Sequence, residues 1–290
     1  MKLELLFLGT GTSAGVPMIG CDCEVCTSSD PRDTRSRPSV LVRYPRPATL
    51  DADTDTADEA AAEDVAAAAE PVQLLIDTAP ELRQQVVRHR LRSIDGVLYT
   101  HNHADHIFGI DDLRRFNAVM QRPIDLYAEP RVLQWLHETF AYIFQPQRNI
   151  NQSFIPRLVP HPVNPFEPLE LFGARWTPLR LLHGRLPILG FRVDVNGASL
   201  AYCTDVSAIP PETYPHLRDL DVLVLDGLRY RHHPTHLTID QALEQIAHIA
   251  PRRAYLTHMA HDVRHADLEA RLPQGVTLSF DGLLVRCDGR

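Results

Sequence analysis

Three histidines and an aspartate lie within six residues, in the segment His101–His106, whose sequence is His-Asn-His-Ala-Asp-His. The segment follows a short apolar run, so a buried strand would deliver several nitrogen and oxygen donors to one place. The spacing suits two adjacent metal ions better than a single tetrahedral ion, with His101 and His103 on one ion and Asp105 and His106 on the other. The alternative is a polar turn with chance histidines, and it is weakened by further potential ligands elsewhere in the chain.

Four more potential ligands stand where predicted strands end, which is where active-site groups are often presented. They are Asp77, His183, Asp205 and His258, and each comes at or just after an apolar run. A lone histidine after a strand is more often structural than a ligand. Four such strand ends, together with the His101–His106 segment, favour a shared metal site.

Three cysteines, Cys21, Cys23 and Cys26, crowd into one short segment near the N-terminus. Three thiolates this closely spaced are typical of a zinc site if a fourth ligand exists, and free buried thiols are the alternative. The chain has five cysteines, an odd number that does not suit a framework of disulfides. Cys203 and Cys287 are expected to be core thiols, and we expect the protein in the reducing cytoplasm.

The charge balance bears on the kind of partner. With 29 basic and 37 acidic residues the net charge is -8, and no basic stripe is visible, so tight binding of a long nucleic acid is disfavoured. A small anion can still bind where metal ions dominate the local field. The N-terminal residues Met1–Leu8 predict a strand rather than a signal peptide. No apolar run approaches the roughly 18 residues of a membrane span, so we expect no membrane partner.

Short β runs alternate with helical patterns along the chain. The predicted strands are 3–8, 39–43, 72–77, 97–99, 124–127, 178–182, 190–195, 199–203, 222–225, 253–256 and 283–286. The predicted helices are 81–90, 111–120, 130–143 and 239–250. This order predicts two sheets packed together with helices outside. We expect one domain over residues 1–290, interrupted at 46–71 by an acidic, alanine-rich, flexible insertion that lacks large apolar residues.

The His101–His106 segment and the distant strand-end residues together resemble the signature of the metallo-β-lactamase superfamily. That signature is His-x-His-x-Asp-His followed by a distant His, Asp and His, and the match extends from Leu5 to about Val285. The resemblance implies an α/β fold, the αββα sandwich, with a dinuclear metal site at one edge.

The resemblance also implies a role for each ligand. One ion would take His101, His103 and His183, the other would take Asp105, His106 and His258, Asp205 would bridge both, and Asp77 would orient the histidine-rich loop from behind the ligands. Two such ions make a bridging hydroxide available near neutral pH and clamp substrate oxygens, which favours hydrolysis. In the oxygen-reducing di-iron branch a carboxylate usually stands at the position of His103. Histidine there favours Zn or Mn, although ligand softness also admits Fe.

His236 opens a predicted helix, in the element His236-Leu237-Thr238, and is not needed as a metal ligand. A His-x-Thr element at this place resembles the phosphodiesterase branch of the superfamily, which includes RNase Z and the PhnP cyclic phosphodiesterase. There the histidine acts as general acid on the leaving alkoxide or holds the scissile phosphate. Asp226, which follows an apolar run, is placed like its acidic partner. The alternative is a helix-capping Thr238 beside surface histidines.

The cysteine triad narrows the resemblance further. PhnP-like proteins carry this triad and complete it with a histidine three residues after the last catalytic histidine, a position held here by His261. The resemblance therefore implies a closed Cys₃His zinc site of Cys21, Cys23, Cys26 and His261, which would be structural. This pattern separates the PhnP-like group from RNase Z.

The sequence thus predicts a metal-dependent phosphodiesterase of the PhnP-like group. The resemblance implies small cyclic or activated diesters as substrates, such as ribose 1,2-cyclic phosphate or nucleoside 2′,3′-cyclic phosphates, attacked by a metal-bridging hydroxide. Three alternatives stay open: tRNA 3′-end processing, which the acidic insertion disfavours; thioester or lactone hydrolysis at the same metals; and a metal-binding scaffold without turnover. The family often forms homodimers, and the sequence does not decide the oligomeric state.

Overall fold

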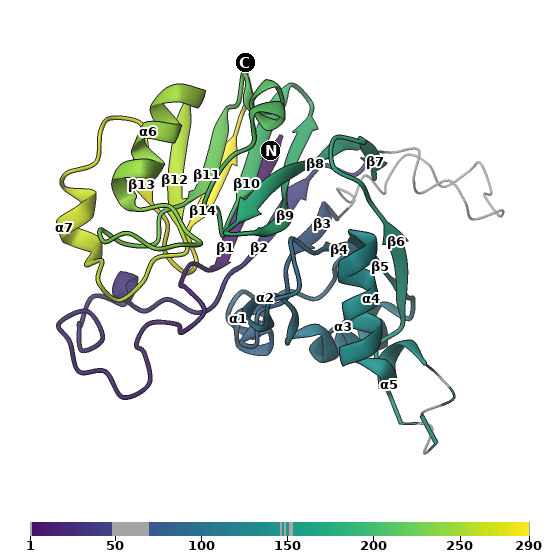
Figure 1. Cartoon of the computed structure of the whole chain (residues 1–290). Helices are drawn as coiled ribbons and strands as arrows, with labels where there is room; N and C mark the ends of the chain where they lie inside the picture. Colours follow the sequence, from purple (N-terminus) through teal and green to yellow (C-terminus); the bar gives the residue numbers. More distant parts are fainter. Residues whose placement is uncertain (1, 48–69, 146, 148, 151–152, 290) are drawn as a thin grey trace, which may run out of the picture.

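Two β-sheets pack face to face in the computed structural model, and helices cover both outer faces (Figure 1). The structure describes residues 2–47, 70–145, 147, 149–150 and 153–289. Of the predicted insertion at 46–71, residues 48–69 lie outside this description. The arrangement is the predicted αββα sandwich.

Each sheet has a simple strand order. The first, β14-β1-β2-β3-β4-β5-β6, consists of β1 Leu3–Gly9, β2 Ser39–Tyr44, β3 Val72–Ile76, β4 Gly96–Leu98, β5 Ile124–Ala128, β6 Leu158–Pro162 and β14 Leu284–Cys287. The second, β13-β12-β11-β10-β9-β8-β7, consists of β7 Leu169–Leu171, β8 Ala174–His183, β9 Leu186–Val195, β10 Ala198–Cys203, β11 Val222–Asp226, β12 Arg253–Thr257 and β13 Val276–Leu278.

The α-helices of the described residues are short. They are α1 Leu82–Arg88, α2 Ala104–Ile107, α3 Leu113–Met120, α4 Pro130–Thr139, α5 Ala141–Phe144, α6 Ile239–Ile249 and α7 His265–Glu269. Single 3₁₀ segments occur at Pro31–Asp33, Ile110–Asp112 and Pro211–Leu217. Within the described part of the chain, none of the helices has the length and apolar character needed to cross a membrane.

Strand β1 shows why such segments become buried strands. Leu3, Leu5 and Phe7 pack in the core between the two sheets, whereas Leu6 and Leu8 pack with the helices on the outer face. Successive side chains of a strand point to opposite faces. A run that is apolar at almost every position can therefore be buried on both sides.

The helices bury apolar stripes against the outer faces of the sheets. Helices α1 and α3 cover the first sheet, with Leu82 and Phe116 in the outer core, and α7 covers the second with Leu268. Helix α6 begins with a capping box. The Thr238 hydroxyl accepts a hydrogen bond from the backbone N–H of Gln241, and the Gln241 side chain accepts one from the N–H of Thr238.

The direction of the strands decides where a site can form. Strands β3 and β4 run parallel, and β10, β11 and β12 run parallel to one another. The carboxyl ends of parallel strands meet at one edge of a sheet. At this edge the backbone N–H of Leu189 in the second sheet donates to the carbonyl oxygen of Thr100, at 3.0 Å. Residues that follow these strands therefore gather where the two sheets meet.

Several elements differ from the sequence-based expectation, among them the short helices α2 and α7, which lie outside the predicted helices. The helix predicted over 130–143 is two helices, α4 and α5, because Phe140 leaves the helical region with φ -110° and ψ 44°. Strands β6, β7 and β13 lie outside the predicted strands. Strand β6 contains Pro160 and Pro162, which a strand tolerates at the edge of a sheet but which weaken its sequence pattern.

Candidate metal centre

Six chain segments bring the predicted ligands, together with Asp77 and Asp226, to one edge of the sandwich. Asp77 follows β3, the His101–His106 segment follows β4, His183 ends β8, Asp205 follows β10, Asp226 ends β11 and His258 follows β12. The first sheet contributes the first two of these segments, and the second sheet contributes the other four. The site therefore belongs to the junction of the sheets and to neither sheet alone.

Three of these residues take a left-handed backbone conformation that non-glycine residues rarely adopt. Their φ angles are 63° for Asp77, 58° for Asp205 and 63° for His258. Each such residue costs about 1 kcal/mol. Strain of this kind persists where the surrounding structure enforces it and clusters at functional sites. Here it turns the chain just after three strands, at the edge where the donors gather.

The first donor group consists of His101, His103 and His183. One ring nitrogen from each lies within 4.8 Å of the others. His101 and His183 are buried, while His103 is exposed and opens the group toward solvent. Burial lowers the pKa of all three imidazoles below its ordinary value, most strongly for His101. Neutral imidazole is the form that binds a metal ion.

The second donor group consists of Asp105, His106, Asp205 and His258, all buried, with one donor atom from each within 4.8 Å of the others. Oδ2 of Asp205 is 3.2 Å from Nε2 of His106, and Oδ1 is 3.2 Å from Nε2 of His258. Asp205 also forms a donor group with His183 and His236. Its carboxylate is therefore within reach of both groups.

The charges in the second donor group favour the binding of a cation. Burial raises the pKa of the Asp205 carboxyl, but His258 and His106 outweigh it and hold the pKa well below its usual value. Burial lowers the pKa of His106, but Asp205, Asp105 and Asp77 outweigh it and hold the pKa well above its usual value. The nearby carboxylates therefore favour a positive charge in this group.

Buried ring nitrogens that make no hydrogen bond show whether divalent ions fit at this site. Among the described residues, Nε2 of His101, Nε2 of His106 and both ring nitrogens of His258 are buried and make no hydrogen bond. Buried polar atoms are normally paired, because an unpaired one costs about 1–3 kcal/mol. Each of these histidines belongs to a donor group, so a metal ion would supply the missing partner. The residues present fit two divalent ions.

Asp77 holds the His106 ring from behind. Its Oδ2 accepts hydrogen bonds at 2.8 Å from Nδ1 of His106 and from the Thr100 hydroxyl, and its Oδ1 accepts one from the Thr100 backbone N–H at 2.8 Å. Fixing Nδ1 in this way leaves Nε2 of His106 to face the metal site, which is how ligating histidines are usually oriented.

His236 lies between the two donor groups without belonging to the predicted ligands. Its Nδ1 is 2.9 Å from Oδ2 of Asp226, and both side chains are buried. The His236 ring stacks on His258 at 4.8 Å and meets His183 at 4.6 Å. It lies in the loop before α6, whose cap is Thr238, so the capping role of Thr238 and the buried site of His236 coexist.

The cysteine triad meets His261 at a separate place. Nδ1 of His261 lies 3.2, 3.4 and 3.7 Å from the Sγ atoms of Cys21, Cys23 and Cys26. Zn–S bonds of about 2.3 Å and Zn–N bonds of about 2.0–2.1 Å in a tetrahedron require S–N separations of about 3.6 Å. A backbone hydrogen bond from Cys26 lowers the pKa of Cys23 to about 6, and burial raises that of Cys26 to about 11. The four residues fit a closed zinc site.

Comparison with known proteins decides the family. Residues 73–259 match a family model described as β-lactamase superfamily domain. A solved structure described as a new diphosphatase from the PhnP family is 38% identical, with a TM-score of 0.81 over 98% of this chain and 97% of that chain. The chain belongs to the metallo-β-lactamase superfamily and, within it, to the PhnP family.

Two further relatives of this metallo-β-lactamase-fold chain differ in what their names say. A Zn²⁺-bound PqqB from Methylobacterium extorquens shares the fold at 18% identity and a TM-score of 0.72, over 98% of this chain and 99% of that chain. An octanoyltransferase from Porphyromonas gingivalis is 35% identical over 286 residues, which are 97% of this chain and 51% of that protein. The chain thus spans about half the length of this curated relative. The fold is one that binds divalent metal ions, and the His and Asp groups fit such a site.

Two residues of this metallo-β-lactamase site escaped the sequence analysis. The Thr100 hydroxyl lies 2.8 Å from Asp77 and 2.9 Å from Nδ1 of His101, so it links the two. The carbonyl oxygen of Thr235 accepts a hydrogen bond from Nδ1 of His183 at 2.7 Å, which leaves Nε2 of His183 for a metal ion. Thr100 directly precedes the histidine-rich segment, which was a usable signal. The role of a backbone carbonyl, such as that of Thr235, leaves no signal in the sequence.

Proposed function

We propose that this protein is a metal-dependent phosphodiesterase that hydrolyses small cyclic or activated diesters, such as ribose 1,2-cyclic phosphate or nucleoside 2′,3′-cyclic phosphates. The observation that carries the proposal is the buried His236–Asp226 pair beside both donor groups. A hydrolase that needed only an activated water would have no evident use for it. An alkoxide leaving from phosphorus needs a proton, and a histidine held at one nitrogen can donate from the other.

Each metal ion has a set of residues to hold it in this proposal. His101, His103 and His183 would hold one divalent ion, Asp105, His106 and His258 would hold the other, and Asp205 would reach both. When bound, two such ions lower the pKa of water and stabilise charge on the phosphoryl oxygens. Zn and Mn suit these ligands, and Fe also fits them. A third ion, zinc, would be held by the cysteine triad and His261 and would be structural.

The proposed reaction consumes one water for each diester. The water oxygen forms a bond to phosphorus, the bond from phosphorus to the leaving oxygen breaks, and the electron pair stays on that oxygen. Nε2 of His236 gives its proton to the leaving oxygen, while Asp226 keeps the ring in place by accepting a hydrogen bond from Nδ1. The proton lost by the water restores His236. A cyclic diester gives one product that carries both the phosphate monoester and the freed hydroxyl, whereas an open diester gives a phosphate monoester and a separate alcohol.

The space beside the donor groups supports a small substrate. A pocket of about 370 Å³ is lined by Asn102, His103, Ala104, Phe108, Trp135 and Leu186. Small-molecule sites usually measure about 300–1,000 Å³. Because His103 also belongs to the first donor group, a substrate in this pocket would lie next to the metal ions. The net charge of -8 gives no support to a stable complex with nucleic acid.

A phosphoanhydride is the second candidate substrate. It is favoured by the PhnP-family structure at 38% identity, whose description names a diphosphatase. Both reactions break a phosphorus–oxygen bond, and both suit the same metal ligands. They differ in the leaving group, since phosphate leaves from an anhydride more readily than an alkoxide leaves from a diester. The His236–Asp226 pair is more useful for the diester, which is why we place the diester first.

An acyl thioester is the third candidate. It is favoured by the name of the Porphyromonas gingivalis octanoyltransferase, of which this chain spans about half. Divalent ions can polarise an acyl carbonyl as well as a phosphoryl group.

Initial rates measured side by side on the metal-loaded full chain test the proposal. The substrates are adenosine 2′,3′-cyclic phosphate, ribose 1,2-cyclic phosphate, bis(p-nitrophenyl) phosphate, diadenosine diphosphate, an octanoyl thioester and a precursor tRNA. We expect the highest kcat/KM on one of the diesters. A higher value on the anhydride or the thioester would assign the protein to that class. No turnover of any substrate at full metal content would overturn the hydrolase itself.

A further inference from the structure

A second pocket lies on the outer face of the first sheet, between α1 and α3. It has a volume of about 470 Å³, and none of its lining residues belongs to either donor group. The apolar part of its lining, which we call the floor, consists of Leu82, Val86, Val87, Leu91, Phe116 and Val119, of which all but Phe116 are aliphatic. The pocket is concave and falls within the usual size range of small-molecule sites, about 300–1,000 Å³.

Two of the floor residues are poorly buried for their type. Val87 is 65% exposed and Val119 is 60% exposed, whereas Leu82 and Phe116, two other floor residues, belong to the outer core. Covering apolar area is favourable by about 25 cal/mol per Å². The apolar lining thus includes both core residues and exposed valines, so an apolar ligand bound here would cover valine side chains that are otherwise exposed to solvent.

The rim of the pocket is cationic. It carries Arg83, Arg92, Arg114 and Arg115 against one acidic residue, Asp112. Arg114 pairs with Asp111 at 3.2 Å, outside the pocket lining. Among the residues that the structure describes, the guanidinium groups of Arg92 and Arg115 have no hydrogen-bond or ion-pair partner. Such a rim is unexpected on a chain with a net charge of -8.

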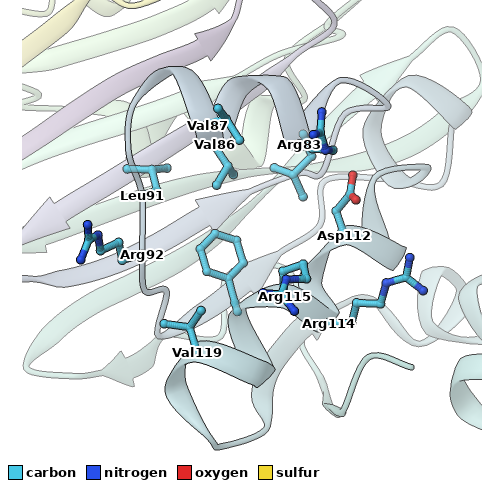
Figure 2. A pocket seen from close by; sticks show the side chains of 11 residues that line it. Arg83, Val86, Val87, Leu91, Arg92, Asp112, Arg114, Arg115 and Val119 are labelled. Carbon is cyan, nitrogen blue, oxygen red and sulfur yellow. The ribbon is translucent and has the colours of Figure 1, made fainter. Parts of the chain in front are cut away.

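The positions of charge and apolar surface point to the shape of a ligand. Figure 2 shows Arg92 on one side of the pocket and Arg114 and Arg115 on the other, with Val86 and Val119 between them. A guanidinium binds a carboxylate with two parallel hydrogen bonds. The floor offers one aromatic ring and otherwise only aliphatic side chains, so it suits a flexible hydrocarbon better than a nucleobase.

We propose that this pocket binds an aliphatic carboxylate of medium chain length. The hydrocarbon chain lies on the valine and leucine floor, and the carboxylate pairs with the unpartnered guanidinium of Arg115 on the side where the arginines cluster. The site is separate from the metal centre and does not depend on which bond the metal centre cleaves.

Calorimetric titration of the metal-loaded full chain with decanoate tests the proposal. Decyltrimethylammonium has the same chain with the opposite charge, and acetate has the carboxylate without the chain. We expect saturable binding of one decanoate per chain, with binding of neither control compound. Equal binding of the cationic compound would overturn the role of the arginines, and equal binding of acetate would overturn that of the floor.

Substitutions locate the binding. Replacing Arg115 by Gln removes a charge-assisted hydrogen bond and should weaken decanoate binding about tenfold. The matched control is Arg88→Gln, which makes the same change at an exposed position of α1 outside the pocket lining. Val119→Glu, at an exposed position of α3, should also abolish binding without loss of folded protein. Full binding in both pocket variants would place the carboxylate elsewhere, for example at the metal centre, and overturn the proposal.

Two other occupants give different results in the same variants. Sedimentation velocity would show a second copy of the chain on this face if a dimer dissociates in Val119→Glu. Cosedimentation with vesicles of anionic phospholipid would show a membrane surface if binding is lost in Arg115→Gln. Either result, without decanoate binding by the unmodified chain, overturns the proposal. A chain that binds decanoate but hydrolyses no diester would contradict only the proposed function.

Discussion

The Nδ1 atom of His236 lies 2.9 Å from Oδ2 of Asp226, and the pair is buried at the edge where the two metal donor groups meet. The imidazole stacks on His258, whose Nε2 faces Asp205, so it is fixed on one side by a carboxylate and on its face by a predicted ligand. A side chain held this firmly is suited to deliver a proton to one atom, and this makes its role testable.

Replacing His236 by Ala should slow hydrolysis in a way that depends on the leaving group. General acids contribute about 10²–10⁴-fold, and the contribution is greatest for a poor leaving group. We expect kcat for an alkoxide-releasing cyclic diester to fall by about that much, and kcat for bis(p-nitrophenyl) phosphate to fall far less. His232→Ala, at an exposed position nearby, is the control. Equal losses on both substrates at unchanged metal content would contradict the role of acid.

Replacing Asp226 by Asn should act through the same step. The amide keeps the size of the carboxylate but not its charge, so the His236 ring loses its ionic partner. We expect the same dependence on the leaving group as in His236→Ala, and a double variant little slower than His236→Ala alone. Residues that act as a unit show such coupling. Additive losses in the double variant would show that Asp226 acts apart from His236.

Replacing Asp77 by Asn should loosen metal binding although Asp77 is not among the predicted ligands. Its carboxylate fixes His106 at 2.8 Å, and the loss of such a partner usually costs about 10–100-fold in metal affinity or activity. Competition with a chelator measures the affinity. Asp125→Asn is the matched control, because Asp125 holds His161 at the same distance outside the metal centre. Equal affinity in the two variants would remove the role of Asp77.

Replacing Cys23 by Ser should remove about one metal ion per chain and leave the others. We expect elemental analysis to find less zinc, a lower Tm, and residual activity on the best diester. Cys203→Ala, which truncates a buried core thiol, should lower Tm without changing metal content. Loss of every ion in the Cys23 variant would show that the two donor groups cannot hold metal ions when the cysteine site is empty.

Replacing Arg35 by Ala should strongly destabilise the fold. Arg35 and Asp33 form a fully buried ion pair at 3.1 Å, and Arg35 also donates to the carbonyl oxygens of Ala260 and Val263, on either side of His261. Removing one member of a buried pair costs about 3–5 kcal/mol. Urea unfolding measures the loss. Arg32→Ala breaks the exposed Arg32–Asp30 pair and should cost at most about 1 kcal/mol. Similar losses in both would refute the anchoring role of Arg35.

Local patterns account for much of the fold. The helix predicted at 239–250 is α6, Ile239–Ile249, because amphipathic spacing and the Thr238 capping box both indicate it. Strands such as β1 and β11 are apolar at nearly every position, so their burial is evident from sequence. The break at Phe140 and the proline-containing strand β6 are less evident, because packing against neighbouring elements overrides weak local preferences there.

The sequence by itself determined which side chains can bind metal ions, since residue type fixes donor chemistry and strand ends indicate where donors are presented. It did not determine the left-handed conformation of Asp77, Asp205 and His258, or the hydrogen bond from His183 to the carbonyl oxygen of Thr235. These depend on how two sheets pack and on where parallel strands end relative to one another. Such distances join segments far apart in the chain, and no local pattern of residues encodes them.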